Sequence, residues 1–237
     1  MGRGRLDLGH TDFPRGIGKG RKRRMGDGAD TDKAGSKILV SGVEREEDSG
    51  ACLRRWTADA HFAALGGICT VLDYSDRQLA SEEMVAKREG YDIEIVKSYM
   101  TKTFPFADET FDLIFHPVSN CYVEEVLPVW KECFRVLKKG GILLAGVDNG
   151  MNYIFDDTET CIVHGLPYNP LKDRKLYEEA MQSGDGIQFS HTVEEQIGGL
   201  LKAGFCLTHL YEDTNGEGNL HEHGIPTFLA VRAEKET

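Results

Sequence analysis

A chain of 237 residues can hold one α/β domain with a sizeable core, and its 40% hydrophobic and 28% charged content is that of a soluble globular protein. The net charge of −11 is uneven, because residues 1–24 carry eight Lys and Arg against two acids. The remainder is therefore strongly acidic, which argues against binding to a nucleic-acid backbone and favours a small-molecule substrate.

The sequence carries no apolar signal segment and no run of about 18 apolar residues, so we expect neither secretion nor a membrane span. The six cysteines form no Cys-x-x-Cys pair, and several lie inside apolar runs, as buried thiols do. We therefore expect a cytoplasmic protein. His221 and His223 are interpreted as part of a polar loop, and no metal site is expected.

Residues 1–61 are predicted to be irregular. Eleven of the 27 glycines fall in the first 50 residues, and Arg21–Arg24 is a basic run. Within this segment only Lys37–Val40 has the pattern of a strand. Such a composition is typical of disorder, so we place the folded domain at residues 62–237.

Strands and helices alternate from residue 62 onward, and this alternation predicts a doubly wound sheet. The predicted strands are Cys69–Tyr74, Ile93–Lys97, Phe111–Phe115, Ile142–Val147, Phe205–Glu212 and Thr227–Ala233, the last two as an antiparallel pair. The predicted helices are one ending at Phe62–Leu65, then Asp76–Glu89, Glu124–Leu137 and Thr192–Ala203. Residues 148–190 are irregular and are predicted to be a lid over the site.

Asp73 is the strongest candidate for a binding residue. It ends a short apolar strand, and a helix follows at once. An acid at this place can accept hydrogen bonds from a ribose diol, although it also suits the positive end of a helix dipole. Tyr74 beside it can lie against an adenine ring or be a half-buried edge aromatic.

The chain resembles the class I S-adenosylmethionine-dependent methyltransferases from roughly Phe62 to Ala233. The resemblance is carried by the segments Cys69–Ser75, Phe111–Phe115, Leu137–Gly141 and Ile142–Val147. It implies an α/β, Rossmann-like fold with a seven-stranded mixed sheet, S-adenosylmethionine as cofactor, and methyl transfer to an acceptor. The catalytic residues and the oligomeric state are left open.

The resemblance also implies further contacts to the cofactor. Tyr99 stands where this family often has an acid for the adenine amino group, and the backbone N–H of Met100 can reach the adenine ring. The segment from His116 to Tyr122 resembles the part that lines the methyl-donor site, where His116 can contact the methionine part or act as a base. The expected cofactor-binding residues are Asp73, Tyr74, Tyr99, Met100, His116, Val118 and Asn120.

The family's glycine-rich loop is missing just before Phe62, and the genetic code suggests a reason. Arg54–His61 can be encoded as CGG CGG TGG ACA GCA GAT GCC CAT, which one base later reads Gly-Gly-Gly-Gln-Gln-Met-Pro-Ile. For Ala29–Lys37 the same shift gives Leu-Thr-Pro-Thr-Lys-Pro-Val-Pro, a lead-in to a first strand. We therefore hypothesise that residues 1 to about 61 are translated out of frame, which would impair cofactor binding.

Two alternatives remain at this point. An NAD-dependent oxidoreductase shares the acid after the second strand, but it should show Gly-x-Gly-x-x-Gly about 20 residues before Asp73, and neither reading frame supplies it. A non-catalytic remnant or binding module that has lost its cofactor loop is the second alternative.

Overall fold

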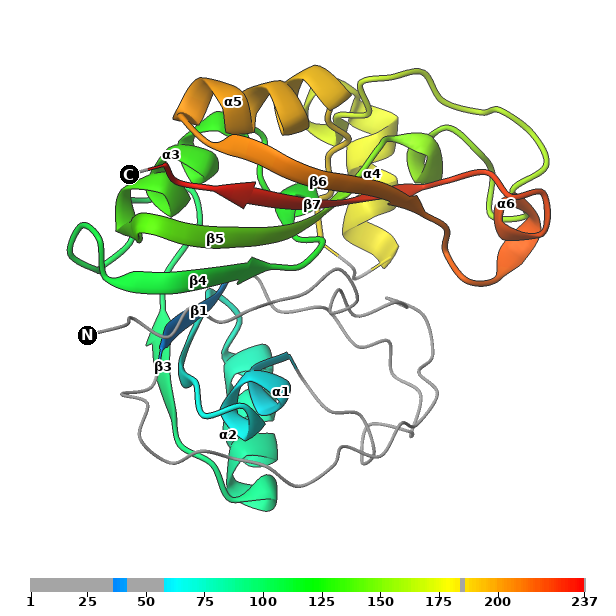
Figure 1. The fold of residues 1–237 in the computed structure, drawn as a ribbon. Helices are drawn as coiled ribbons and strands as arrows, with labels where there is room; N and C mark the ends of the chain where they lie inside the picture. The colour runs from blue at the N-terminus through cyan, green and yellow to red at the C-terminus, as the bar shows by residue number, and fades with distance from the viewer. Residues whose placement is uncertain (1–35, 42–57, 184–185, 237) are drawn as a thin grey trace.

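The computed structural model describes residues 36–41, 58–183 and 186–236, which form one seven-stranded mixed sheet (Figure 1). The strands are β1 Lys37–Ser41, β2 Ile68–Asp73, β3 Ile93–Lys97, β4 Phe111–His116, β5 Leu137–Asp148, β6 Cys206–Asp213 and β7 Phe228–Glu234. Their order across the sheet is β3-β2-β1-β4-β5-β7-β6. The first five are parallel, and β7 runs antiparallel to both β5 and β6, which confirms the predicted fold class.

The helices lie on both faces of the sheet. They are α1 Ala58–Ala64, α2 Asp76–Glu89, α3 Leu127–Val136, α4 Arg174–Ser183, α5 Gly199–Ala203 and α6 Gly218–Glu222, with a π-helix at Glu194–Gly198 before α5. Figure 1 shows α1 and α2 on one side of the sheet and α3 and α5 on the other. The predicted bounds of α2 are confirmed, and both ends are capped: the Ser75 side chain accepts from the backbone N–H of Gln78, and Gly90 ends the helix at φ 78°.

The central strand β1 contributes to the core on both faces. Leu39 belongs to the main core cluster with Trp130 of α3, whereas Ile38 and Val40 pack on the α1 and α2 side with Phe62. This alternation is the period of two that a strand between two helical layers requires. β1 also lies in parallel register with both β2 and β4.

β1 and the start of α1 therefore come from the segment 1–61 that the composition predicts to be irregular. β1 is part of the sheet, and its Leu39 has no exposed surface. The predicted strand at Lys37–Val40 is confirmed. The out-of-frame hypothesis for residues 1 to about 61 stays a prediction, and residues 1–35 and 42–57 of that segment lie outside the described residues.

Three elements differ from the expectations. The segment 148–190 contains helix α4, where the Asp173 carboxylate accepts from the backbone N–H of Lys175 at 2.8 Å. Strand β5 starts at Leu137 and not at residue 142, since Gly140 at φ 72° lets the chain bend within the strand. The predicted single helix Thr192–Ala203 is a π-helix followed by α5.

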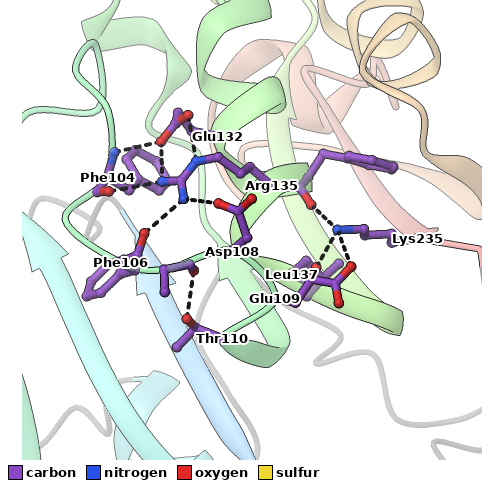
Figure 2. Close-up of polar contacts among 11 residues, drawn as sticks. Phe104, Phe106, Asp108, Glu109, Thr110, Glu132, Arg135, Leu137 and Lys235 are labelled. Atoms are coloured by element: carbon purple, nitrogen blue, oxygen red, sulfur yellow. Dashed lines mark hydrogen bonds and ion pairs between the residues drawn. The ribbon is translucent and has the colours of Figure 1, made fainter.

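A network around Arg135 secures the amino-terminal edge of β4 (Figure 2). Its guanidinium donates to the carboxylates of Glu132 and Asp108, and also to the carbonyl oxygens of Phe104 and Phe106. The Glu132 carboxylate in turn accepts from the backbone N–H of Phe104 at 2.7 Å. These contacts raise the pKa of Arg135 and lower that of Glu132, so both stay charged and tie the loop to α3.

Lys235 closes the end of α3 beside this network, as Figure 2 shows. Its ammonium donates to the carbonyl oxygens of Phe134 and Leu137 at 2.9 and 2.8 Å, and Glu109 lies 3.6 Å away. A cation at this place satisfies carbonyl groups that a helix leaves unpaired at its C-terminus. Among the helices that the structure describes, none is long and apolar enough to cross a membrane.

Candidate functional site

The carboxyl ends of the parallel strands bring three polar residues to one edge of the sheet. Ser41 ends β1, Asp73 ends β2 and His116 ends β4. The chain builds outward from β1 through β2 to β3 and then returns to continue through β4 on the other side. Doubly wound sheets bind their ligands where the strand order reverses in this way, so this edge is the candidate site.

Asp73 lies at this edge and is only 7% exposed. One carboxylate oxygen accepts from the backbone N–H of Ser75 at 2.7 Å, and the carbonyl oxygen of Asp73 accepts from the N–H of Ser98 at 3.0 Å. These bonds fix the acid between the end of β2 and the first turn of α2. The position agrees with both interpretations of this residue, since the carboxylate stands at the ligand edge and also at a helix N-terminus.

An exposed pair of tyrosines lies beside Asp73. The rings of Tyr74 and Tyr99 stack with their centroids 5.6 Å apart, and the Lys102 ammonium lies 4.8 Å from the Tyr99 centroid. Tyr74 is 38% exposed and Tyr99 51% exposed, so the pair presents aromatic surface at the ends of β2 and β3. Met100 follows, but its side chain packs in the core, which leaves its backbone as the part that can meet a ligand.

His116 is the centre of a fully buried chain of hydrogen bonds. The Ser41 hydroxyl lies 2.8 Å from His116 Nδ1, and His116 Nε2 lies 2.9 Å from Asn120 Oδ1. The Asn120 amide then donates to Gln196 Oε1 at 2.7 Å. Desolvation lowers the pKa of His116 to about 4, so the imidazole is neutral at pH 7. We name Ser41, His116, Asn120 and Gln196 the polar chain.

Two further residues fasten the polar chain to its surroundings. The buried His191 lies with Nε2 3.0 Å from the carbonyl oxygen of Asn120, and the Trp130 indole N–H donates to the carbonyl oxygen of Gln196 at 3.0 Å. The Trp130 ring also meets the His116 ring edge-to-face. Val118, between His116 and Asn120, is half-buried.

The sequence prediction missed Ser41, Trp130, His191 and Gln196. Ser41 and His116 are 75 residues apart, and Asn120 and Gln196 are 76 apart, so no local pattern joins them. The one sequence feature that could have identified Ser41 is its position at the end of a strand. Ser41 is the last residue of an apolar strand, where a doubly wound sheet presents its ligand-facing edge.

The insert 148–190 packs against the segment that follows β4. The backbone N–H of Phe189 donates to the carbonyl oxygen of Cys121 at 2.8 Å. The Tyr153 hydroxyl donates to Gln188 Oε1 at 3.0 Å, and its ring stacks on that of Tyr168 at 5.2 Å. The insert therefore brings aromatic side chains over the segment that follows β4.

Asp148 ends β5 at the base of the insert and is 7% exposed. Its carboxylate accepts from the backbone N–H of Gly150 and from the Asn152 amide. Burial raises the pKa of Asp148 to about 6. Within the described part of the chain, no group of three or more His, Cys, Asp or Glu side chains is placed to hold a metal ion.

The residues at this edge fit S-adenosylmethionine. Asp73 offers an anionic acceptor for a ribose diol, and the exposed rings of Tyr74 and Tyr99 offer flat surface for adenine. The neutral His116 places no positive charge near a sulfonium. The connection 42–57 between β1 and α1 lies outside the described residues.

Comparisons with known proteins agree with this assignment. A family profile described as "Methyltransferase domain" matches residues 48–145. The uncharacterized methyltransferase YbaJ of Bacillus subtilis is 40% identical over 182 residues, covering 73% of this chain and 70% of that protein. The methyltransferase phqN of Penicillium fellutanum is 28% identical over 145 residues, covering 59% of this chain and 39% of that protein.

A solved structure shows the same fold. The S-adenosylmethionine-dependent methyltransferase from Mesorhizobium loti superposes with a TM-score of 0.58 at 20% sequence identity. The superposition covers 84% of this chain and 91% of the other. With the identity to YbaJ and the strand order of the sheet, these findings show that the chain belongs to the class I S-adenosylmethionine-dependent methyltransferases.

Proposed function

We propose that this protein transfers the methyl group of S-adenosylmethionine to a small-molecule acceptor at the carboxyl edge of its sheet. The observation that carries the donor side is Asp73, a carboxylate with 7% exposure at the end of β2, beside the exposed pair Tyr74 and Tyr99. The bound donor supplies the electrophilic methyl group. The protein's own contribution is to hold donor and acceptor in line.

We assign each of the expected cofactor-binding residues a role toward the cofactor. The Asp73 carboxylate accepts from the ribose hydroxyls, while Tyr74 and Tyr99 bound the adenine together with the backbone N–H of Met100. The half-buried Val118 bounds the methyl-donor side. The fully buried His116 and Asn120 stand behind this surface, where their side chains bond to each other.

The acceptor lies between the segment after β4 and the insert 148–190, which acts as the lid. The stacked rings of Tyr153 and Tyr168, with the Tyr153 hydroxyl bonded to Gln188, support an acceptor site on this side. The acidic remainder of the chain supports a partner other than nucleic acid. Buried thiols such as Cys69 and Cys133 support a reducing cytoplasm.

Labelled methyl transfer tests the acceptor class. The protein is incubated with methyl-tritiated S-adenosylmethionine and a cell extract separated into small molecules, proteins and nucleic acids. We expect enzyme-dependent label in the small-molecule fraction, with Asp73→Asn lowering it and the exposed Asp76→Asn leaving it unchanged. Label in protein or nucleic acid would contradict the acceptor class, and no transfer at all would favour the non-catalytic remnant.

The out-of-frame hypothesis adds a comparison of two chains. If residues 54–61 disrupt the donor loop, the chain as written should bind S-adenosylmethionine weakly. Arg54, Arg55 and Trp56, which lie outside the described residues, would then bring bulk and positive charge to that loop. A version with the frame restored there gains Gly-Gly-Gly-Gln-Gln and should bind tighter. The comparisons with known proteins lend no support to impairment. Equal micromolar affinity of the two versions would refute it.

A further inference from the structure

The polar chain fixes the direction of each of its hydrogen bonds. Asn120 presents its amide oxygen to His116 Nε2 and its amide nitrogen to Gln196. The Nε2 atom of His116 must then carry the imidazole proton, because an amide oxygen only accepts. Nδ1 is left to accept from the Ser41 hydroxyl. The same neutral tautomer of His116 therefore makes both hydrogen bonds, the one with Ser41 and the one with Asn120.

Burial leaves these side chains no polar atom for a ligand. Ser41 and His116 have no exposed surface, and Asn120 and Gln196 are each 1% exposed. Both ring nitrogens of His116 and both amide atoms of Asn120 are already bonded. A direct hydrogen bond from either side chain to the donor would break a buried bond, which is costly in a dry interior.

The two ends of the polar chain belong to different sides of the site. Ser41 is the last residue of β1 and precedes the connection 42–57 to α1. Gln196 lies in the π-helix Glu194–Gly198, and His191, at the end of the insert, holds the Asn120 carbonyl oxygen. Single-turn π-helical segments frequently occur at functional sites.

We propose that His116, Asn120 and Gln196 are positioning residues that hold the end of β1 at a fixed distance from the π-helix and the insert, without touching either substrate. This inference rests on the proposed function, because it assigns β1 to the donor side and the insert to the acceptor side. It replaces the expected direct cofactor contact of the His116 and Asn120 side chains with an indirect role.

Remote substitutions separate positioning from direct contact. Calorimetric titration with S-adenosylhomocysteine compares Ser41→Ala, His116→Gln, His116→Asn and Gln196→Leu with the parent chain. His116→Gln keeps a donor toward Asn120, and His116→Asn keeps an acceptor toward Ser41. Thr70→Val is the matched control, because Thr70 is 4% exposed and hydrogen-bonded within the sheet but lies outside the polar chain.

Positioning predicts that Gln196→Leu weakens binding by about tenfold although Gln196 is at the far end of the chain. Combining it with Ser41→Ala should add little, since either change opens the same chain. Thr70→Val should bind S-adenosylhomocysteine within about twofold of the parent chain. This should hold even if Thr70→Val lowers the melting temperature as much as Gln196→Leu does. An unchanged affinity in Gln196→Leu, with a loss in both His116 variants, would show direct contact and overturn the proposal.

Nitrogen NMR of the histidine rings tests the positioning role independently of the proposed methyl-transfer function. If the parent chain binds no S-adenosylhomocysteine, the proposed function fails, and the ring shifts still decide the positioning claim. We expect a neutral His116 with its proton on Nε2, whose resonances move in both Ser41→Ala and Gln196→Leu but not in Thr70→Val. A proton on Nδ1, or no response to Gln196→Leu, would overturn the claim.

Discussion

The imidazole of His116 is fully buried, and desolvation lowers its pKa to about 4. In the unfolded chain the same ring titrates near its ordinary value of about 6.5. At pH values between these two pKa values, His116 binds a proton in the unfolded state but not in the folded state. The stability that the neutral ring contributes is therefore complete above pH 6.5 and is lost as the pH falls toward 4.

The first prediction follows from this difference in pKa. Between pH 7 and pH 5 the free energy of unfolding of the parent chain should fall by about 2 kcal/mol relative to that of His116→Gln. Urea unfolding at both pH values measures it. Asp148 acts in the opposite direction, because its raised pKa makes the folded state gain stability as the pH falls below about 6, but both chains share that contribution. Parallel pH profiles for the two chains would refute the neutral buried ring.

At the scale of single residues, the sequence predicts those site residues that a pattern of neighbouring residues marks. Asp73 could be found because a strand, an acid and a helix follow one another within a few residues. Ser41 and Gln196 could not, since their partners are more than 70 residues away. His116 was singled out for its place after a strand, but only the packing of Trp130 against it shows that it is buried.

At the scale of elements, the loop before β4 depends on one guanidinium. Arg135 donates five hydrogen bonds, two of them to the carbonyl oxygens of Phe104 and Phe106 (Figure 2). A lysine ammonium cannot reproduce this planar fork. We predict that Arg135→Lys lowers the free energy of unfolding by about 2 kcal/mol.

The matched control for this prediction is Arg174→Lys. Arg174 pairs with Glu178 one turn later on α4, and its side chain is 91% exposed. Such exposed pairs contribute about 0.5 kcal/mol or less, so the control should unfold almost as the parent chain does. Chemical denaturation of the three chains decides the matter, and equal midpoints for both variants would contradict the role given to Arg135.

The insert is fastened to the C-terminal part of the domain through Glu159. Its carboxylate accepts from the backbone N–H of Leu220 at 2.7 Å and from the Asn215 amide at 3.2 Å. The Asn219 amide donates to the Glu159 carbonyl oxygen at 2.9 Å. These bonds fasten this half of the insert to α6 and to the loop before it.

Two glycines offer a paired test of this fastening. A Cβ at Gly218 would lie 2.6 Å from the Glu159 carboxylate, whereas a Cβ at Gly224 would meet no described atom within 4 Å. Both residues have positive φ, so alanine strains the backbone at either site. Gly218→Ala should cost about 1–3 kcal/mol more than Gly224→Ala, because it also displaces Glu159.

Hydrogen exchange locates that effect. In Gly218→Ala the amides of residues 156–163 should exchange faster than in the parent chain, and in Gly224→Ala they should not. Protection of these amides that is the same in the two variants would mean that Glu159 does not hold the insert.

Element prediction succeeded where periodicity and caps agree. Helix α2 begins and ends at the predicted residues because Ser75 and Gly90 mark its ends. The sequence prediction missed helix α4, although its apolar residues Leu176, Tyr177, Ala180 and Met181 recur at helical spacing. None of these four is fully buried, so the helix lies at the surface. The π-helix was missed because its hydrogen-bond pattern has no distinct sequence signal.

At the scale of the whole molecule, the strand order determines where the candidate site lies. The parallel strands β2, β1 and β4 place Asp73, Ser41 and His116 at one edge, although these residues are spread over more than 70 positions of the chain. The alternation of strands and helices predicted a doubly wound sheet, but not this strand order. It could not predict that residues 37–41 supply the central strand with such complete burial, because five residues in a glycine-rich segment give a weak signal.

The central claim is that the edge formed by Asp73 binds the methyl donor. The most direct measurement is calorimetric titration of S-adenosylmethionine into the parent chain, Asp73→Ala and Asp76→Ala, the last an exposed acid of the same helix start. We predict that Asp73→Ala loses about 1.5–3 kcal/mol of binding free energy, as removal of a charged hydrogen-bond acceptor should, while Asp76→Ala binds as the parent does. Unchanged affinity in Asp73→Ala would contradict the account.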